Sequence, residues 1–334
     1  MYTTKVKFRA AIALTSAVMM LTAACGEDSS GSNRTVRFTV FTGATTSWGV
    51  YIADAMGFFK THGVNIKYVS VGSGSSAMQV VASGDTDFAL SDATITANAS
   101  KTGLETQFVA GQFKRFAAEL ACQPGLTTGS YPESMRALKG KTIGYTAPGS
   151  GSDFYLQYSL MEAGVDPADV ERIPVGGAPQ LIAAYRATSV DCVTAYQPMQ
   201  QELGDASVPI NWQEGEGPAE FSDYLLNGVV ASKKYIDGHE DEVRAVALAM
   251  KDAAEFASDP ANAEEIAKAT VKFFPGSNTT DLAAIAEEIA DAYTYSVTEQ
   301  QVASAAIVYK AVTGEDYPLE YADIVAEPAR NIIG

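Results

Sequence analysis

The sequence predicts an α/β fold made of two similar lobes and a helical C-terminal segment. Stretches that alternate apolar and polar residues, as strands do, are followed by stretches with helical spacing, and this order occurs twice. From residue 232 onward the patterns are helical and rich in alanine. Of the 334 residues, 47% are apolar and 19% are charged, so the chain has enough apolar residues for the cores of two domains.

The first lobe begins with a β-branched, alternating stretch that is typical of a strand. Strands and helices then alternate, in the order strand 35–41, helix 48–60, strand 66–71, a helix that ends near Ala82, and strand 86–91. Gly63 follows the first helix and is a suitable terminator for it. This order predicts a parallel sheet with crossover helices.

The second lobe repeats this order about 104 residues later. Its elements are strand 141–146, helix 154–163, strand 172–175, helix 179–188 and strand 191–196. Phe41 corresponds to Tyr145, and Asp87 corresponds to Asp191, at this offset. We expect structural capping roles for both aspartates. The repeat has two alternative causes, common descent of the two halves or the strand–helix order that α/β proteins share. Either cause predicts two similar lobes.

The C-terminal segment has apolar residues at helical spacing over 240–258, 261–273, 280–293 and 298–313. We expect these helices to pack on the first lobe. The second lobe would then be an insertion, joined by crossings near 117–124 and 224–230. The expected domains are therefore residues 35–120 with 228–334, and residues 121–227.

The N-terminus has the pattern of a secretory signal over residues 1–24. Lys5, Lys7 and Arg9 precede an apolar run that is too short to cross a membrane, and small residues stand before Cys25. The string LTAAC resembles a bacterial lipobox, although Thr22 stands where leucine is commonest. It predicts lipid attachment at Cys25, and an ordinary cleaved signal is the alternative.

Residues 25–34 are expected to form a lipidated tether, since residues 26–34 are small and polar. Cleavage after residue 24 would remove three positive charges and change the net charge from −17 to −20. Such acidity argues against nucleic-acid binding. We expect a chain anchored to the outer face of the cytoplasmic membrane, or a periplasmic one.

Cofactor and metal sites are not expected. The two histidines and three cysteines lack the spacing of a zinc site, and the turn GSGSSA matches only part of a dinucleotide-binding motif. Cys122 and Cys192 leave two alternatives open: a disulfide, which an exported chain allows, or two buried free thiols.

Glycine- and hydroxyl-rich turns stand between a strand and a helix at five places in the two lobes. They are TGATTSW, GSGSSA, SDAT, PGSGSD and GGAPQ, which begin at residues 42, 72, 91, 148 and 176. Ligands of open parallel sheets bind beyond the carboxyl ends of the strands, where helix N-termini offer unpaired N–H donors. The turns therefore predict a ligand cleft between the lobes, although each could serve only to start its helix.

The stretches GFFKTHGVNIKYVSVGSG, ASGDTDFALSDA, LKGKTIGYTAPGSGSDFYLQYSLMEAGVDPADVERIPVG and ATSVDCVTAYQP, in this order, resemble solute-binding lipoproteins of ABC importers. The resemblance is to the nitrate, sulfonate, taurine and thiamine-pyrimidine-precursor class and covers roughly residues 35–260. It implies a type II periplasmic-binding-protein fold with two hinge crossings that closes around a solute. It also implies delivery to ABC permease subunits and no catalysis.

The resemblance places ligand-binding positions in the turns: Ser47, Trp48, Gly74, Ser75, Asp92, Thr94, Ser150, Ser152, Asp153, Gly177 and Tyr196. Trp48 would stack on the solute or lie in the core, and the serines and threonine would form hydrogen bonds. Asp92 and Asp153 favour an aminopyrimidine-like heterocycle over a sulfonate- or nitrate-type anion, because the turns lack lysine and arginine. Arg115 is the basic residue nearest the expected cleft.

Two other functions remain open. One is a pyrimidine-precursor synthase-like enzyme on the same fold, which would need an active-site histidine, whereas His62 and His239 lie outside the predicted turns. The other is a sensory ectodomain without transport.

Overall fold

Three sheets carry the fold in this computed structural model, which describes residues 34–115 and 118–334. The predicted signal peptide, Cys25 and the tether up to residue 33 lie outside the described residues. We call residues 34–115 and 227–334 the flanking region, and residues 118–226 the central region.

The flanking region holds a two-stranded and a three-stranded sheet, which a bridge between Phe38 and Phe88 joins. The strands are β1 (Arg34–Phe41), β2 (Val64–Val71), β3 (Ala89–Ser91), β4 (Thr106–Phe113) and β10 (Asn227–Ser232). β1 and β2 are parallel as predicted, whereas β10 is antiparallel to both β3 and β4. The chain returns from the central region along β10, and β10 therefore runs opposite to β3 and β4.

The central region holds one five-stranded sheet of order β7-β6-β8-β5-β9. These strands are β5 (Ala118–Cys122), β6 (Thr142–Tyr145), β7 (Glu171–Pro174), β8 (Cys192–Tyr196) and β9 (Ser207–Ile210). β6 is parallel to β7 and β8, while β5 is antiparallel to β8 and β9. The boundary predicted between residues 120 and 121 thus falls inside β5, because the small residues of AELAC gave no clear strand pattern.

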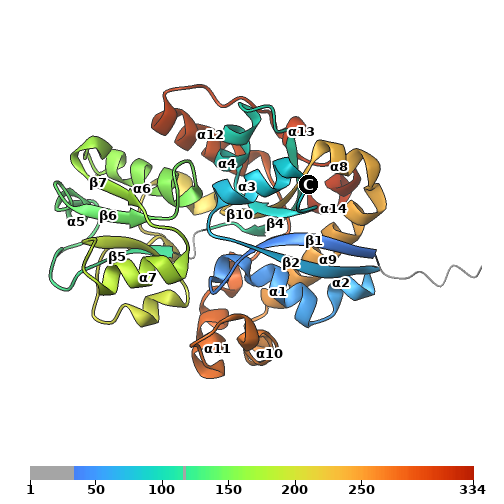
Figure 1. Cartoon of the computed structure of the whole chain (residues 1–334), viewed down its shortest axis with the longest axis horizontal. Coiled ribbons are helices and arrows are strands. Elements are labelled where there is room, and N and C mark those ends of the chain that lie inside the picture. Colours follow the sequence, from blue (N-terminus) through green and yellow to red (C-terminus); the bar gives the residue numbers. More distant parts are fainter. Residues whose placement is uncertain (1–33, 116–117) are drawn as a thin grey trace, which may run out of the picture. The chain divides into compact units, whose positions relative to one another are not determined.

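Most helices follow the predicted positions (Figure 1). In the flanking region they are α1 (Trp48–Ala55), α2 (Phe58–Thr61), α3 (Gly74–Ser83), α4 (Ala93–Ser100), α8 (Lys233–Gly238), α9 (Glu240–Ala257), α10 (Ala263–Thr270), α11 (Thr279–Glu288), α12 (Glu299–Thr313), α13 (Tyr321–Ile324) and α14 (Arg330–Ile333). In the central region they are α5 (Glu133–Arg136), α6 (Gly151–Glu162) and α7 (Ala178–Arg186). The helix predicted over 48–60 is split, because Gly57 has a φ of 81° in the left-handed region.

Short 3-10 helices occur at Thr45–Ser47, Pro167–Asp169, Met199–Glu202, Trp212–Glu214, Ala219–Asp223, Pro260–Asn262, Val271–Phe273, Ala290–Ala292 and Glu327–Ala329. The last turns of the predicted helices 261–273 and 280–293 are among them, so both helices are shorter than the sequence suggests.

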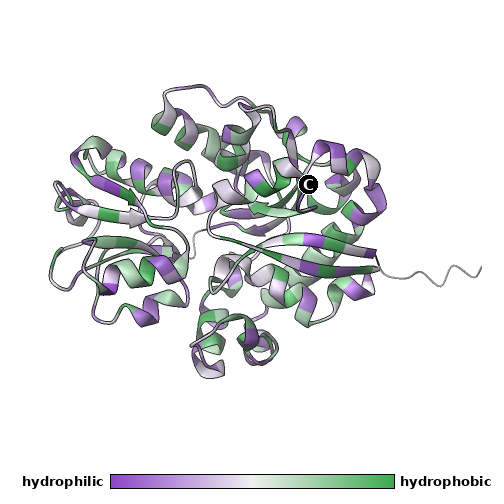
Figure 2. Ribbon diagram, in the orientation of Figure 1, coloured by the Kyte–Doolittle hydropathy of each residue, from purple (hydrophilic) through white to green (hydrophobic). Residues whose placement is uncertain are grey.

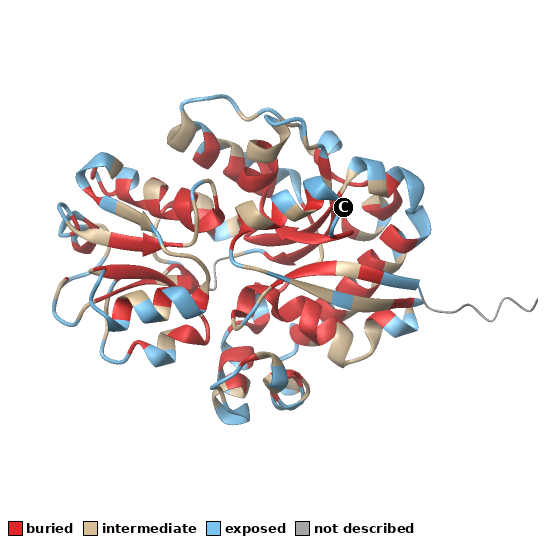
Figure 3. Cartoon of the chain, viewed as in Figure 1, coloured by how far each residue is buried: buried red, intermediate tan, exposed pale blue. Residues whose placement is uncertain are grey.

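Many residues of the strands and helices are hydrophobic, and most strand residues are buried (Figures 2 and 3). The main core contains large aromatic residues such as Phe38, Phe88 and Phe108, all fully buried. It also joins the two regions, because Phe154 of α6 stacks on Tyr309 of α12 with ring centroids 6.0 Å apart. No helix in the described part of the chain is long and apolar enough to cross a membrane.

The internal repeat is visible in its hydrogen bonds. The carboxylate of Asp87 accepts from the backbone N of Arg37 at 2.7 Å, and Asp191 accepts from the backbone N of Thr142 at 2.8 Å. Each aspartate also donates its own backbone N–H to the carbonyl of the same partner. The two aspartates thus hold the backbone at the fourth residue of β1 and at the first residue of β6, which is the kind of structural role expected for them.

A disulfide joins β5 to β8 through Cys122 and Cys192, which face each other in the register of the two strands. Their Cα atoms are 3.9 Å apart and both residues are fully buried. Of the two alternatives that the sequence left open, the structure has the disulfide.

The two passages between the regions run side by side at the flanking sheet. The backbone N of Tyr224 donates to the carbonyl of Lys114, and that of Leu226 donates to the carbonyl of Phe113, both at 3.0 Å. The start of the first passage is thereby bonded to the end of the second.

Candidate ligand-binding site

A pocket of about 300 Å³ lies where the strand-to-helix turns of the two regions meet. The flanking region contributes the segments after β1, β2 and β3, and the central region contributes those after β6, β7 and β8. Leu226 and Asn227, at the start of β10, complete the lining. The pocket thus lies beyond the carboxyl ends of parallel strands, as expected for ligand sites of such sheets.

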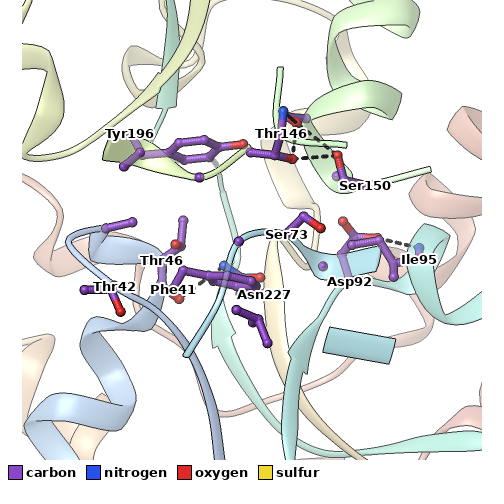
Figure 4. A pocket seen from close by; sticks show the side chains of 18 of the residues that line it. Phe41, Thr42, Thr46, Ser73, Asp92, Ile95, Thr146, Ser150, Tyr196 and Asn227 are labelled. Carbon is purple, nitrogen blue, oxygen red and sulfur yellow. Dashed lines mark hydrogen bonds between the residues drawn. The ribbon is translucent and has the colours of Figure 1, made fainter. Parts of the chain in front are cut away.

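Figure 4 shows how the lining residues divide between the two regions. Tyr196, Thr146 and Ser150 lie on the side of the central region, and Phe41 and Thr46 lie on the opposite side. A solute in this pocket would contact both regions at once.

Six of the predicted ligand-binding residues line this pocket, and five do not. The six are Gly74, Asp92, Ser150, Ser152, Gly177 and Tyr196. The five are Ser47, Trp48, Ser75, Thr94 and Asp153.

Trp48 lies in the core instead of the pocket wall. Its side chain is fully buried, its Nε1 donates to Oγ1 of Thr270 at 2.8 Å, and its ring meets Phe274 edge-on at 5.3 Å. Ser47 beside it accepts from the backbone N of Phe41 at 2.7 Å and so closes the turn after β1. Both residues face the core because the 3-10 turn Thr45–Ser47 sets the phase of α1.

Ser75 and Asp153 lie beside the pocket and have other partners. Oγ of Ser75 donates to the carbonyl of Pro148 at 2.9 Å, a contact between the two regions. Asp153 forms an ion pair with Arg172 and accepts from the backbone N of Gly149. Asp153 is therefore not among the lining residues, and its carboxylate is paired within the central region.

Arg115 is also removed from the pocket. It forms an ion pair with Asp291 and donates to the carbonyl of Gln213 at 3.0 Å, close to the passages between the regions. It does not line the pocket, so the basic residue predicted nearest the cleft does not reach it.

Asp92 is the N-cap of α4 and is 1% exposed. Its Oδ1 accepts from the backbone N of Ile95 at 2.8 Å and from Oγ1 of Thr94 at 2.6 Å. Its Oδ2 accepts from the hydroxyl of Tyr155, which belongs to the central region, at 2.5 Å. Thr94 thus positions Asp92 and does not line the pocket. Burial raises the pKa of the Asp92 carboxyl, and these hydrogen bonds oppose that rise.

The turn after β6 gathers three hydroxyl groups at the pocket. Oγ1 of Thr146 lies 2.8 Å from both Oγ of Ser150 and Oγ of Ser152, and the two serine oxygens are 3.0 Å apart. Ser152 also accepts from the backbone N of Thr146, which repeats the arrangement of Ser47 and Phe41 in the first lobe. These hydroxyls are able to donate to or accept from a solute.

Tyr196 completes this wall from the end of β8. Burial raises the pKa of its hydroxyl to about 12, so the group stays neutral at physiological pH and is available as a donor.

Several lining residues were not predicted from the sequence: Phe41, Thr46, Ser73, Thr146, Tyr155, Gln180, Leu226 and Asn227. Thr146 and Ser73 belong to turns that the sequence did single out, so their hydroxyls were a usable signal. Asn227 gave none, because it reaches the pocket only through the pairing of β10 with β4. Its Nδ2 donates to the carbonyl of Thr46 at 3.2 Å.

Direct contacts between the regions surround the pocket. The backbone N of Thr45 donates to the carbonyl of Gln197 at 2.8 Å. Gly72 and Gly177 approach so closely that a Cβ on Gly72 would lie 3.6 Å from the backbone N of Gly177. The two sets of turns therefore meet around the pocket.

Comparison with solved structures identifies the fold. A protein from Bordetella bronchiseptica RB50 has a TM-score of 0.77 at 22% identity, with 90% of this chain and 97% of that chain covered. The zinc-bound ligand-binding component of an ABC-type import system from Staphylococcus aureus has a TM-score of 0.71 at 13% identity, covering 90% and 99%. The alkanesulfonate-binding protein SsuA from Xanthomonas axonopodis pv. citri, bound to MOPS, has a TM-score of 0.67 at 15% identity, covering 89% and 97%.

These similarities show that the chain has the periplasmic-binding-protein fold, as its sequence predicts. No curated protein sequence matches the chain. The family described as NMT1/THI5 like matches residues 44–263, which is more than half of the chain, and the chain therefore belongs to this family.

Proposed function

We propose that this protein is the extracytoplasmic solute-binding component of an ABC importer. The observation that carries the proposal is the position of the pocket, which is lined by the turns of both regions. A solute would be enclosed when the regions rotate about the two adjacent passages, and the closed form would then dock on permease subunits. The structural relatives include ABC-type import and alkanesulfonate-binding components, which supports this role.

We propose binding without chemical conversion. The lining consists of hydroxyl, amide, aromatic and aliphatic groups with one carboxylate, which is a composition suited to recognition. The Nε2 atom of His62 lies 2.7 Å from Oδ2 of Asp252, and the ring of His239 stacks on that of Tyr235. Neither histidine is among the lining residues, so a synthase that uses an active-site histidine is the less supported alternative.

We also propose that lipid on Cys25 holds the protein at the outer face of the cytoplasmic membrane. Metabolic labelling with an alkyne fatty acid should mark the unaltered protein and not the variant Cys25→Ser. A Cys25→Ser variant that still takes up the label would contradict this assignment.

Native mass spectrometry of the protein purified from its own host tests the solute-binding role. A small molecule should co-purify and be released on unfolding, and small-angle scattering should show a more compact protein when it is added back. Scattering profiles that are identical with every metabolite offered would contradict the proposal.

Uptake measurements separate import from sensing. Deletion of the gene should abolish uptake of the co-purified solute, while a sensory ectodomain would leave uptake unchanged and alter only the response to the solute.

A further inference from the structure

The pocket has one charged side chain in its lining, that of Asp92, and contains no lysine, arginine or histidine among the described residues. No described cation forms an ion pair with Asp92. Burial raises the pKa of its carboxyl, and the hydrogen-bond donors that lower it are all neutral. A carboxylate that is 1% exposed and has no counter-ion is costly unless its charge is compensated. A cationic group on a solute would provide that compensation, and protonation of Asp92 is the alternative.

The structural duties of Asp92 do not require a free negative charge. Ser or Asn would cap α4 about equally well, and the cap needs only one oxygen. The Oδ1 atom accepts from the backbone N of Ile95 and the hydroxyl of Thr94, and the backbone of Thr94 also acts on the carboxylate. Oδ2 accepts from the hydroxyl of Tyr155, and each carboxylate oxygen can accept about two hydrogen bonds. Oδ2 therefore keeps one acceptor position, and Asp92 belongs to the pocket lining.

Aromatic rings from both regions accompany this carboxylate. Phe41 comes from the turn after β1, and Tyr155 and Tyr196 come from the central region. The faces of such rings attract cations, and the attraction is stronger where water is excluded. A pocket that holds a carboxylate and also has aromatic residues in its lining suits an organic cation, whereas the carboxylate would repel an anion.

We propose that Asp92 accepts a hydrogen bond from a protonated nitrogen of the solute, so that the pocket selects small organic cations over sulfonate- and nitrate-type anions. This inference rests on the proposed function and names the solute class for the same pocket. The competing arrangement is a protonated Asp92 that donates its hydrogen to an acceptor on a neutral or anionic solute.

A charge series on one molecular frame distinguishes these arrangements. Isothermal titration calorimetry at pH 7 would compare benzylamine, benzyl alcohol and benzenesulfonate, which share a phenyl ring and are cationic, neutral and anionic. We expect benzylamine to bind at least tenfold more tightly than either of the others. Equal or tighter binding of benzyl alcohol or benzenesulfonate overturns the inference, as does the absence of benzylamine binding.

The variant Asp92→Asn keeps the size and capping ability of the residue and removes its charge. It should weaken benzylamine binding at least tenfold and change benzyl alcohol binding less than threefold. The matched control is Asp54→Asn, because Asp54 also accepts from a tyrosine hydroxyl, that of Tyr68 at 2.7 Å, and does not line the pocket. Unchanged benzylamine binding in Asp92→Asn overturns the inference, and the charge series on the unaltered protein decides the question if that variant does not fold.

Small-angle scattering on the same samples separates this inference from the proposed function. If the protein becomes compact with benzenesulfonate, the proposed role as a solute receptor stands and the cation selectivity inferred here is wrong. If the protein responds to none of the three compounds and to no co-purified solute, both the proposed function and the cation selectivity are wrong.

Discussion

The hydroxyl of Tyr155 donates a hydrogen bond to Oδ2 of Asp92 at 2.5 Å. Tyr155 belongs to α6 of the central region, and Asp92 caps α4 of the flanking region, so this bond connects the two regions beside the pocket. It also orients the carboxylate that we assign to solute recognition. The same contact thus joins the two regions and fixes the carboxylate that we propose for solute binding.

Tyr155→Phe should weaken solute binding about tenfold. The substitution removes a hydrogen bond to a carboxylate, which contributes about 1.5–3 kcal/mol, and keeps the buried ring. Calorimetry with the co-purified solute measures the effect. Tyr158→Phe, on the same helix but next to Glu220, is the control and should leave the affinity unchanged. Equal affinities of Tyr155→Phe and the unaltered protein would show that the bond does not support the closed pocket.

Gly72→Val should hold the regions apart at the pocket. A Cβ on Gly72 would already lie 3.6 Å from the backbone N of Gly177, so the two methyl groups of valine would occupy the space between the turns. We expect at least tenfold weaker solute binding and a larger radius of gyration in the presence of solute, with little change in Tm. Gly238→Val is the control, since a Cβ there meets no atom within 4 Å. A Gly72→Val protein that becomes as compact as the unaltered one would contradict this prediction.

Removal of the disulfide should lower the free energy of unfolding by about 4 kcal/mol. Cys122 and Cys192 are 70 residues apart in the sequence, and a cross-link of that span strongly restricts the unfolded chain. Urea unfolding of the double variant C122A/C192A, compared with the unaltered protein without reductant, measures the difference. Reduction of the unaltered protein by dithiothreitol should give a loss of similar size. Stability that is the same in all three samples would rule out a stabilising role for the bond.

Glu119→Gln should stabilise the protein at pH 8 and have little effect at pH 4. Burial, followed by the charges of Glu214 and Glu288, raises the pKa of Glu119 to about 7. A carboxyl with a raised pKa destabilises the fold progressively as pH rises from its unfolded-state value through 7, because the folded state binds the extra proton. We expect a gain of about 3 kcal/mol at pH 8. Glu287→Gln is the control, because Glu287 is exposed. A gain in stability from Glu119→Gln that is equal at pH 4 and pH 8 would refute the raised pKa of Glu119.

The alternation of strands and helices was predictable because each has its own hydrophobic period, and the repeat was visible at a nearly constant offset. The turns that form the pocket were predictable too, since a strand end followed by a helix start marks the binding edge of a parallel sheet. Gly74, Asp92 and Tyr196 reach the pocket for this reason.

The direction of each side chain within a turn was not predictable. A single 3-10 turn before α1 sends Ser47 and Trp48 into the core, and an ion pair with Arg172 holds Asp153 outside the lining. Asn227 lies far from the other lining residues in the sequence and meets them only because β10 pairs with β4. Such pairings depend on the whole fold, so local patterns carry no trace of them.

The bonded passages between the regions have a mechanical consequence. Since Phe113 and Lys114 are hydrogen-bonded to Leu226 and Tyr224, these described parts of the two connections are held together and would resist sliding past each other. A hinge made of two joined connections would bend about one axis, so the two regions would return to the same alignment each time they close. Hydroxyl and carboxylate groups on opposite walls would then regain their mutual positions in every cycle without any other guide.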